Sequence, residues 1–163
     1  KYTWSAWIKP TAFVAWQGLW DFYGASNNFF IVYTHTVTSD YGDWGPVTKG
    51  MHVAWLSSSG NNLFVRSNDN VLDTNKFSHI VITYDGALAQ ANRIVIYVDG
   101  SVVTGSLYSP QSSYGTIAQI NPASINLGMS TANGDFPGVI DDARFYNRLL
   151  SPAEIANLYN MGK

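Results

Sequence analysis

Hydrophobic and polar residues alternate along most of this chain with the two-residue period of β-strands. The alternation predicts strands over Tyr2–Lys9, Phe13–Tyr23, Asn28–His35, Met51–Ser57, Asn62–Ser67, Lys76–Tyr84, Arg93–Val98, Ser101–Thr104, Ala123–Met129 and Pro137–Asn147. Asp99-Gly100 is the strongest two-residue hairpin signal, and Gly18 is expected to break or bulge its strand. So many short strands in a row are typical of a β-sandwich or jelly roll.

The last dozen residues change to a helical period. The segment Ser151–Glu154 is a capping box with proline at the first helical position. Ile155, Leu158 and Tyr159 then follow at the spacing of one helix face. The pattern predicts a short C-terminal helix and gives its glutamate a structural role.

Length and composition set the class of protein. The 163 residues fit a single domain over residues 1–163, and the absence of cysteine excludes disulfides. The net charge is only −2, with no basic cluster, which argues against nucleic acid and anionic membranes as partners. No apolar run is long enough to insert into a membrane. Abundant Ser, Thr, Asn, Gly and aromatic residues suit extracellular β-proteins with polar ligand surfaces.

Catalytic signals are weak. Glu154 is the only glutamate, so the glutamate pair common among sandwich glycosidases cannot exist, although aspartate pairs remain open. The chain has no nucleophile elbow, no P-loop and no nucleotide fingerprint. The sequence therefore predicts a protein that is not an enzyme.

Three stretches together resemble the laminin G-like, concanavalin A-like jelly-roll domains. Thr3–Pro10 is similar to that family's "SAWVKP" strand, and Phe77–Gly86 with Ile96–Gly100 is similar to "W-x-H-V-A-x-T-Y-D-G … L-Y-V-D-G". Phe136–Ser151 resembles the terminal "F-x-G-x-I-D-E-V-R-I-Y-N-R-A-L-S" strand that leads into the helix. Their order and spacing also match, so the resemblance covers nearly the whole chain.

The resemblance implies an all-β, two-sheet antiparallel jelly-roll sandwich with a short C-terminal helix. Members are mostly extracellular, cell-surface or virion modules; many bind carbohydrate, some bind proteins, and many hold calcium. The family usually has a further strand before the one at Thr3–Pro10. Either that strand is supplied from elsewhere, or it was trimmed away, or a sheet edge is left open and accepts another chain.

The long polar stretch Thr36–Gly50 is the first candidate binding site, because loops of this length are often functional. Tyr41 and Trp44 offer flat faces to sugar rings, and Asp43 offers acceptors for hydroxyl groups. Alternatively, the loop folds its tryptophan inward. Asp40 and Asp43 also leave open a calcium site within the loop.

Trp20 and His35, on neighbouring predicted strands, are predicted as further sugar contacts. The alternative for Trp20 is a core residue. Asp141 is expected to share an apolar face with Val139, Ala143 and Phe145, where a carboxylate is costly unless paired or metal-bound. By resemblance Asp141 is a ligand for Ca²⁺, the expected cofactor. The alternative is an aspartate that caps backbone amides or pairs with an arginine.

The sequence leaves three functions open. The first is a non-catalytic, lectin-like module of a secreted or surface protein that binds a polysaccharide or glycan, with calcium dependence as an added expectation. The second is a structural or adhesive module, such as a virion decoration or surface-assembly domain, with a protein partner at the open sheet edge. A glycanase is a third function, and the single glutamate argues against it.

Overall fold

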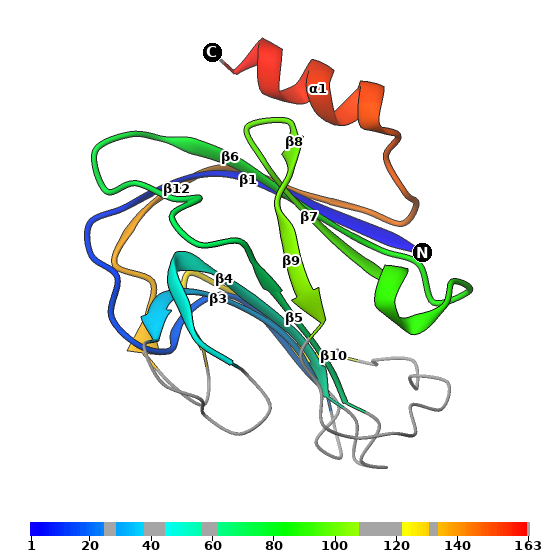
Figure 1. The fold of residues 1–163 in the computed structure, drawn as a ribbon, viewed down its shortest axis with the longest axis horizontal. Coiled ribbons are helices and arrows are strands. Elements are labelled where there is room, and N and C mark those ends of the chain that lie inside the picture. The colour runs from blue at the N-terminus through cyan, green and yellow to red at the C-terminus, as the bar shows by residue number, and fades with distance from the viewer. Residues whose placement is uncertain (25–28, 38–44, 57–61, 108–121, 131–133, 163) are drawn as a thin grey trace.

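A computed structural model describes residues 1–24, 29–37, 45–56, 62–107, 122–130 and 134–162. Two β-sheets stack face to face, and one helix lies across the outer face of one of them (Figure 1). The predicted all-β jelly-roll sandwich with a C-terminal helix is confirmed. Most predicted strands lie within a few residues of observed ones.

The first sheet has the strand order β12–β1–β6–β7–β8. Its strands are β1 (Tyr2–Pro10), β6 (Ser78–Tyr84), β7 (Ile94–Val98), β8 (Ser101–Val102) and β12 (Gly138–Tyr146). All of these strands pair in antiparallel fashion.

The second sheet has the strand order β10–β2–β3–β4–β5–β9, and β11 pairs with β2 in parallel. Its strands are β2 (Gln17–Gly24), β3 (Phe29–Val37), β4 (Val47–Leu56), β5 (Leu63–Ser67), β9 (Thr104–Leu107), β10 (Pro122–Leu127) and β11 (Gly134–Asp135). The register of β2 shifts between Gly18 and Trp20, which confirms the bulge predicted at the glycine. A 3₁₀ turn, Gln90–Asn92, precedes β7.

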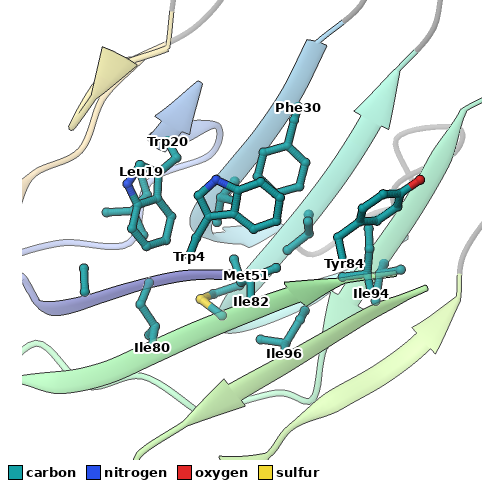
Figure 2. Packing of buried hydrophobic residues seen from close by; sticks show 14 of the residues in the cluster. Trp4, Leu19, Trp20, Phe30, Met51, Ile80, Ile82, Tyr84, Ile94 and Ile96 are labelled. Atoms are coloured by element: carbon teal, nitrogen blue, oxygen red, sulfur yellow. The ribbon is translucent and has the colours of Figure 1, made fainter. Parts of the chain in front are cut away.

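The hydrophobic core fills the space between the sheets (Figure 2). The Trp4 ring of the first sheet stacks on Phe30 of the second, with 4.3 Å between ring centroids. Trp55 of the second sheet stacks on Tyr84 of the first, also at 4.3 Å. Alternate residues of each strand supply this layer, as the two-residue period requires.

The helix α1 (Pro152–Met161) covers the outer face of the first sheet. Its capping box is present as predicted: the backbone N–H of Glu154 donates to Ser151 Oγ, and the N–H of Ser151 donates to Glu154 Oε2. Ile155 is fully buried in a small second apolar cluster on this sheet. Trp7 stacks on Tyr159 of the helix, whereas Trp4 lies in the core between the sheets, so the two tryptophans point to opposite faces.

One predicted alternation is wrong. Asp141 pairs with Trp7 on the outer face, whereas Phe145 pairs with Trp4 on the inner face, so the two do not share a face. The register between them shifts, and Asp142 has a left-handed backbone with φ of 49°. This bulge changes which residues point inward for the rest of the strand.

Candidate functional site

The connection between β3 and β4 is shorter than the sequence pattern suggested. β3 continues to Val37 and β4 already begins at Val47, so both ends of the polar stretch are in the sheet. Its anchoring bonds run from Lys49 N–H to Thr36 Oγ1 (3.0 Å) and from Arg66 Nη1 to the carbonyl oxygen of Pro46 (2.8 Å). Tyr41, Asp43 and Trp44 lie outside the described residues, as does Asp40, and their roles stay predictions.

A polar groove of about 380 Å³ lies next to the start of β4. It is lined by Lys49, Asn70, Val71, Leu72, Asp73, Thr74, Asn75 and Lys76. The backbone builds it: Asn70 N–H donates to the Thr48 carbonyl at 2.7 Å, and Leu72 N–H donates to the Lys49 carbonyl at 3.1 Å. The groove therefore lies at the end of the second sheet to which the β3–β4 connection returns.

The groove walls are held in place by local hydrogen bonds. Lys49 and Asn70 have left-handed backbones, with φ of 46° and 56°. Asp73 Oδ1 accepts from the N–H of Asn75 at 2.8 Å, and Lys76 Nζ lies 3.1 Å from Asp99 Oδ2. The lining thus offers amide, hydroxyl, ammonium and carboxylate groups, which can donate to and accept from hydroxyl groups.

The sequence interpretation missed this groove. The Asn and Asp residues around position 70 are typical of a turn, and none of them was predicted as a site residue. The groove depends on hydrogen bonds between segments about 20 residues apart, between β4 and the chain that follows β5. The sequence signal for this groove was Asp69 and Asn70, which come just before the polar segment 73–76.

The central part of the outer face of the second sheet is buried. Seven of its residues are 3 % exposed or less, and they are Asp21, Ile31, Tyr33, His35, His52, Ala54 and Phe64. Its other described residues include the partly buried Tyr23, Arg66, Ser124 and Asn126. His35 is fully buried, so its ring does not fit a direct contact with a sugar. The part of this face around His35 is a buried layer rather than an open platform.

His35 is one link in a hydrogen-bonded chain. Trp16 N–H donates to His35 Nδ1 at 3.0 Å, so the neutral imidazole carries its proton on Nε2. That Nε2 lies 2.6 Å from His52 Nδ1, to which it donates. Burial and the neighbouring His52 lower the pKa of His35 from 6.5 to about 3, so the ring stays neutral at physiological pH.

Trp20 is 5 % exposed and belongs to the core between the sheets, where Figure 2 shows it beside Leu19. A ring that stacks on a sugar needs an open face, which Trp20 does not have. The burial favours the alternative interpretation, in which Trp20 is a core residue.

Asp141 is exposed on β12, on the same face as the helix. Its Oδ1 accepts from the backbone N–H of Asp142 at 2.8 Å, and the carboxylate of Asp142 pairs with Arg144 at 2.7 Å. Calcium needs six to eight oxygen ligands. Among the described residues, no three His, Asp or Glu side chains lie close enough to share a metal ion. The described residues around Asp141 alone do not fit a calcium site.

Glu154 is committed to the helix cap. Arg148 Nη2 lies 2.7 Å from its Oε1, and this hydrogen bond, with those from Ser151, lowers the pKa of Glu154 from 4.5 to about 2. A carboxyl group held ionised in this way cannot donate a proton near neutral pH.

A profile of the concanavalin A-like lectin/glucanase superfamily matches residues 1–156. The chain therefore belongs to this superfamily, as the sequence motifs indicated. No curated protein sequence gives a significant match. No helix among the described residues is long and apolar enough to cross a membrane.

Solved structures share the fold. Domain 4 of AbnA, a GH43 extracellular arabinanase from Geobacillus stearothermophilus solved with arabinotriose, superposes with a TM-score of 0.59 at 19 % identity. The match covers 98 % of this chain and 66 % of that one. The receptor-binding domain of botulinum neurotoxin type G gives a TM-score of 0.57 at 14 % identity, covering 99 % of this chain and 38 % of the toxin domain. The chain thus spans only part of each neighbour.

Proposed function

We propose that this chain is a non-catalytic carbohydrate-binding module of a secreted or surface protein, and that the polar groove beside Lys49 is part of its ligand site. The observation that carries the proposal is the groove itself, an open surface whose lining mixes hydroxyl, amide and charged groups. Sugar hydroxyls are recognised by such mixed donors and acceptors.

The comparisons support the ligand class without defining the ligand. The arabinanase domain that shares this fold was solved with arabinotriose, a short glycan. Tyr41, Asp43 and Trp44 belong to the β3–β4 connection, which rejoins the sheet near Lys49. We propose that the rings of Tyr41 and Trp44 add stacking surfaces to the groove.

The absence of catalysis is part of the same proposal. Its support is that Glu154, the only glutamate, is engaged at the helix cap with Arg148. A retaining or inverting glycosidase needs two carboxyl groups on opposite sides of one bond. Calcium dependence through Asp141 stays a separate prediction, which melting temperatures measured in calcium and in EDTA would test.

Titration calorimetry with a panel of oligosaccharides, arabinotriose among them, tests the groove. Asn70→Gly removes the side chain but keeps the left-handed backbone, so the fold is expected to be unchanged. Loss of one side-chain hydrogen bond should weaken the Kd by roughly three- to tenfold. Asn92→Gly makes the same change at the exposed turn before β7, outside the groove, and should leave the Kd unchanged.

Two results would contradict the proposal. One is a folded parent protein that binds no glycan in the panel. The other is a glycan that binds the parent, Asn70→Gly and Lys49→Gly with equal affinity. Glycine suits the left-handed backbone of position 49 as well. The second result would move the ligand site away from the groove while keeping the ligand class.

Protein binding is the second candidate function. The neurotoxin domain of similar fold is a receptor-binding domain, and the present chain exposes apolar side chains at one margin of the sandwich.

A further inference from the structure

The two lysines that line the polar groove differ in their partners. Lys76 Nζ lies 3.1 Å from Asp99 Oδ2. Lys49 forms no ion pair with a carboxylate among the described residues. Asp99 does not itself line the groove, because it lies in the turn between β7 and β8. The ammonium group of Lys76 is therefore held at the groove by a carboxylate that lies outside the lining.

Asp99 is the fixed member of this ion pair. Its Oδ1 accepts from the backbone N–H of His79 at 2.9 Å, and its own N–H donates to the His79 carbonyl oxygen at 2.8 Å. Asp99 and Gly100 form the two-residue turn of the hairpin, with φ of 51° and 77°. The Asp99 side chain is 23 % exposed, whereas the Lys76 side chain is 58 % exposed. The position of the carboxylate thus determines where the lysine ammonium lies.

The negative charge of Asp99 is not needed to hold the hairpin. A two-residue turn with positive φ at both positions favours Asn-Gly as well as Asp-Gly. The side-chain oxygen of an asparagine can accept from the same backbone N–H. Exposed ion pairs contribute little to stability. What the carboxylate adds beyond an amide is the neutralisation of Lys76 at the groove.

With Asp99 included, the formal charges at the groove balance. Lys49 and Lys76 bring two positive charges to the lining, and Asp73 brings one negative charge. Asp99 supplies the second negative charge, next to Lys76. Without Asp99 the groove would keep one net positive charge, which attracts carboxylate and sulfate groups. With it, the remaining N–H groups of Lys76 are donors for hydroxyl and ring oxygens.

We infer that Asp99 is a specificity-determining residue of the groove, which positions Lys76 as a hydrogen-bond donor and restricts the ligand to uncharged glycans. This specificity rests on the proposed glycan binding and narrows it to one class of sugars. Asp99 is a positioning residue that acts through Lys76 without touching the ligand. A uronic acid or a sulfated sugar would bring a second anion to an ammonium group that already has one, which is discrimination by repulsion.

A glycan array tests the ligand class. It carries neutral oligosaccharides, arabinotriose among them, together with oligogalacturonates and the methyl esters of the same oligogalacturonates. The hits of the folded parent protein should be uncharged, and no oligogalacturonate should bind more tightly than its methyl ester. The Kd of the best neutral hit should change little when NaCl is raised from about 0.05 to 0.5 M, because an uncharged ligand forms no ion pair that salt can screen.

The variant Asp99→Asn keeps the turn and the acceptor for His79 N–H but removes the charge. It should weaken the Kd of the best neutral hit by roughly three- to tenfold and leave the melting temperature unchanged. Asp85→Asn is the matched control. Asp85 also precedes a glycine, pairs with Lys1 at 2.9 Å and accepts from Ala87 N–H at 3.0 Å, but it lies outside the groove. This variant should leave the Kd unchanged.

A double-mutant cycle separates positioning from a structural role. Lys76→Met removes the ammonium group and keeps most of the aliphatic side chain. In this background Asp99→Asn should have no further effect on the Kd, because Asp99 acts only through Lys76. If Asp99 instead shaped the groove through the hairpin, its substitution would weaken binding in both backgrounds.

Three outcomes would overturn the inference and leave glycan binding in place. They are oligogalacturonates that bind more tightly than their methyl esters, an unchanged Kd in Asp99→Asn, and an equal loss from Asp99→Asn with and without Lys76. A blank array for the folded parent would instead contradict the proposed glycan binding, and the specificity of the groove would be rejected with it.

Discussion

His35 donates a hydrogen bond from Nε2 to Nδ1 of His52 across 2.6 Å, and both rings are buried in the outer face of the second sheet. Trp16, whose φ is 63°, supplies the backbone N–H that His35 accepts on its other nitrogen. The chain requires two neutral imidazoles. A proton on His35 Nδ1 would remove the acceptor of Trp16, and a proton on His52 Nδ1 would face the Nε2–H of His35.

Stability should therefore fall as the pH drops below 6.5, the ordinary pKa of histidine. The folded pKa of His35 is lower, about 3, so between these values the unfolded chain binds the proton and the folded chain does not. Stability is fully present above pH 6.5 and is lost progressively toward pH 3. Urea unfolding at pH 7.5 and at pH 5 measures the difference before most carboxylates titrate.

The variant His35→Asn keeps an acceptor for Trp16 N–H at the position of Nδ1 but does not titrate. It should be less stable overall and should show a smaller loss between pH 7.5 and pH 5. His79, whose pKa burial also lowers, contributes to the part that remains. An unchanged pH dependence in His35→Asn would exclude the histidine pair as its source.

The stability of a Trp20 variant distinguishes a core role for this residue from a sugar-stacking role. Because its ring is 5 % exposed within the inter-sheet core, Trp20→Ala should lower the free energy of unfolding by about 3–5 kcal/mol. Denaturant titration measures this loss. A small change in stability accompanied by loss of glycan binding would instead support the sugar-stacking role.

Gly18 is packed too closely for a side chain. A Cβ atom there would lie 2.5 Å from Ser130 Cβ and 2.6 Å from its backbone nitrogen. Gly18→Ala should therefore cost about 1–3 kcal/mol. Gly134→Ala is the control, because its Cβ would have 4.0 Å to the Trp16 carbonyl oxygen, its nearest neighbour. Equal stabilities of the two variants would show that the β2 bulge adapts.

The helix cap predicts a smaller effect. Ser151→Ala removes the side chain that accepts from Glu154 N–H and should cost about 1 kcal/mol. Ser151→Asp supplies another acceptor and should recover most of the stability. Thermal unfolding of the three proteins decides between this account and one in which packing of Ile155 alone holds the helix.

The fold could be predicted from the sequence because its information is local. Alternation predicted a strand over Lys76–Tyr84, where the structure has Ser78–Tyr84, and the Ser-Pro-Ala-Glu segment defined the helix start. The strand Thr104–Leu107 was missed beyond Thr104, because its position depends on pairing with β5. The prediction that Asp141 shares a face with Phe145 was wrong because one residue with a left-handed backbone, Asp142, shifts the alternation.

The site was less predictable, for the same physical reason. The groove forms where Asn70 and Leu72 pair with the start of β4, a contact between segments that no spacing rule links. The burial of His35 and Trp20 likewise follows from how strands lie side by side in the second sheet. The groove lies near the point where the β3–β4 connection rejoins the sheet, whereas the loop residues predicted as the site, Tyr41, Asp43 and Trp44, lie outside the described residues.

A glycan array probed with the purified, folded parent protein and with Asn70→Gly tests the central claim most directly, with each protein run in calcium and in EDTA. The account predicts reproducible glycan hits for the parent that are weaker for Asn70→Gly in the same buffer. Hits that disappear in EDTA would add the calcium requirement predicted for Asp141. A blank array for the parent in both buffers would contradict the proposed carbohydrate-binding function.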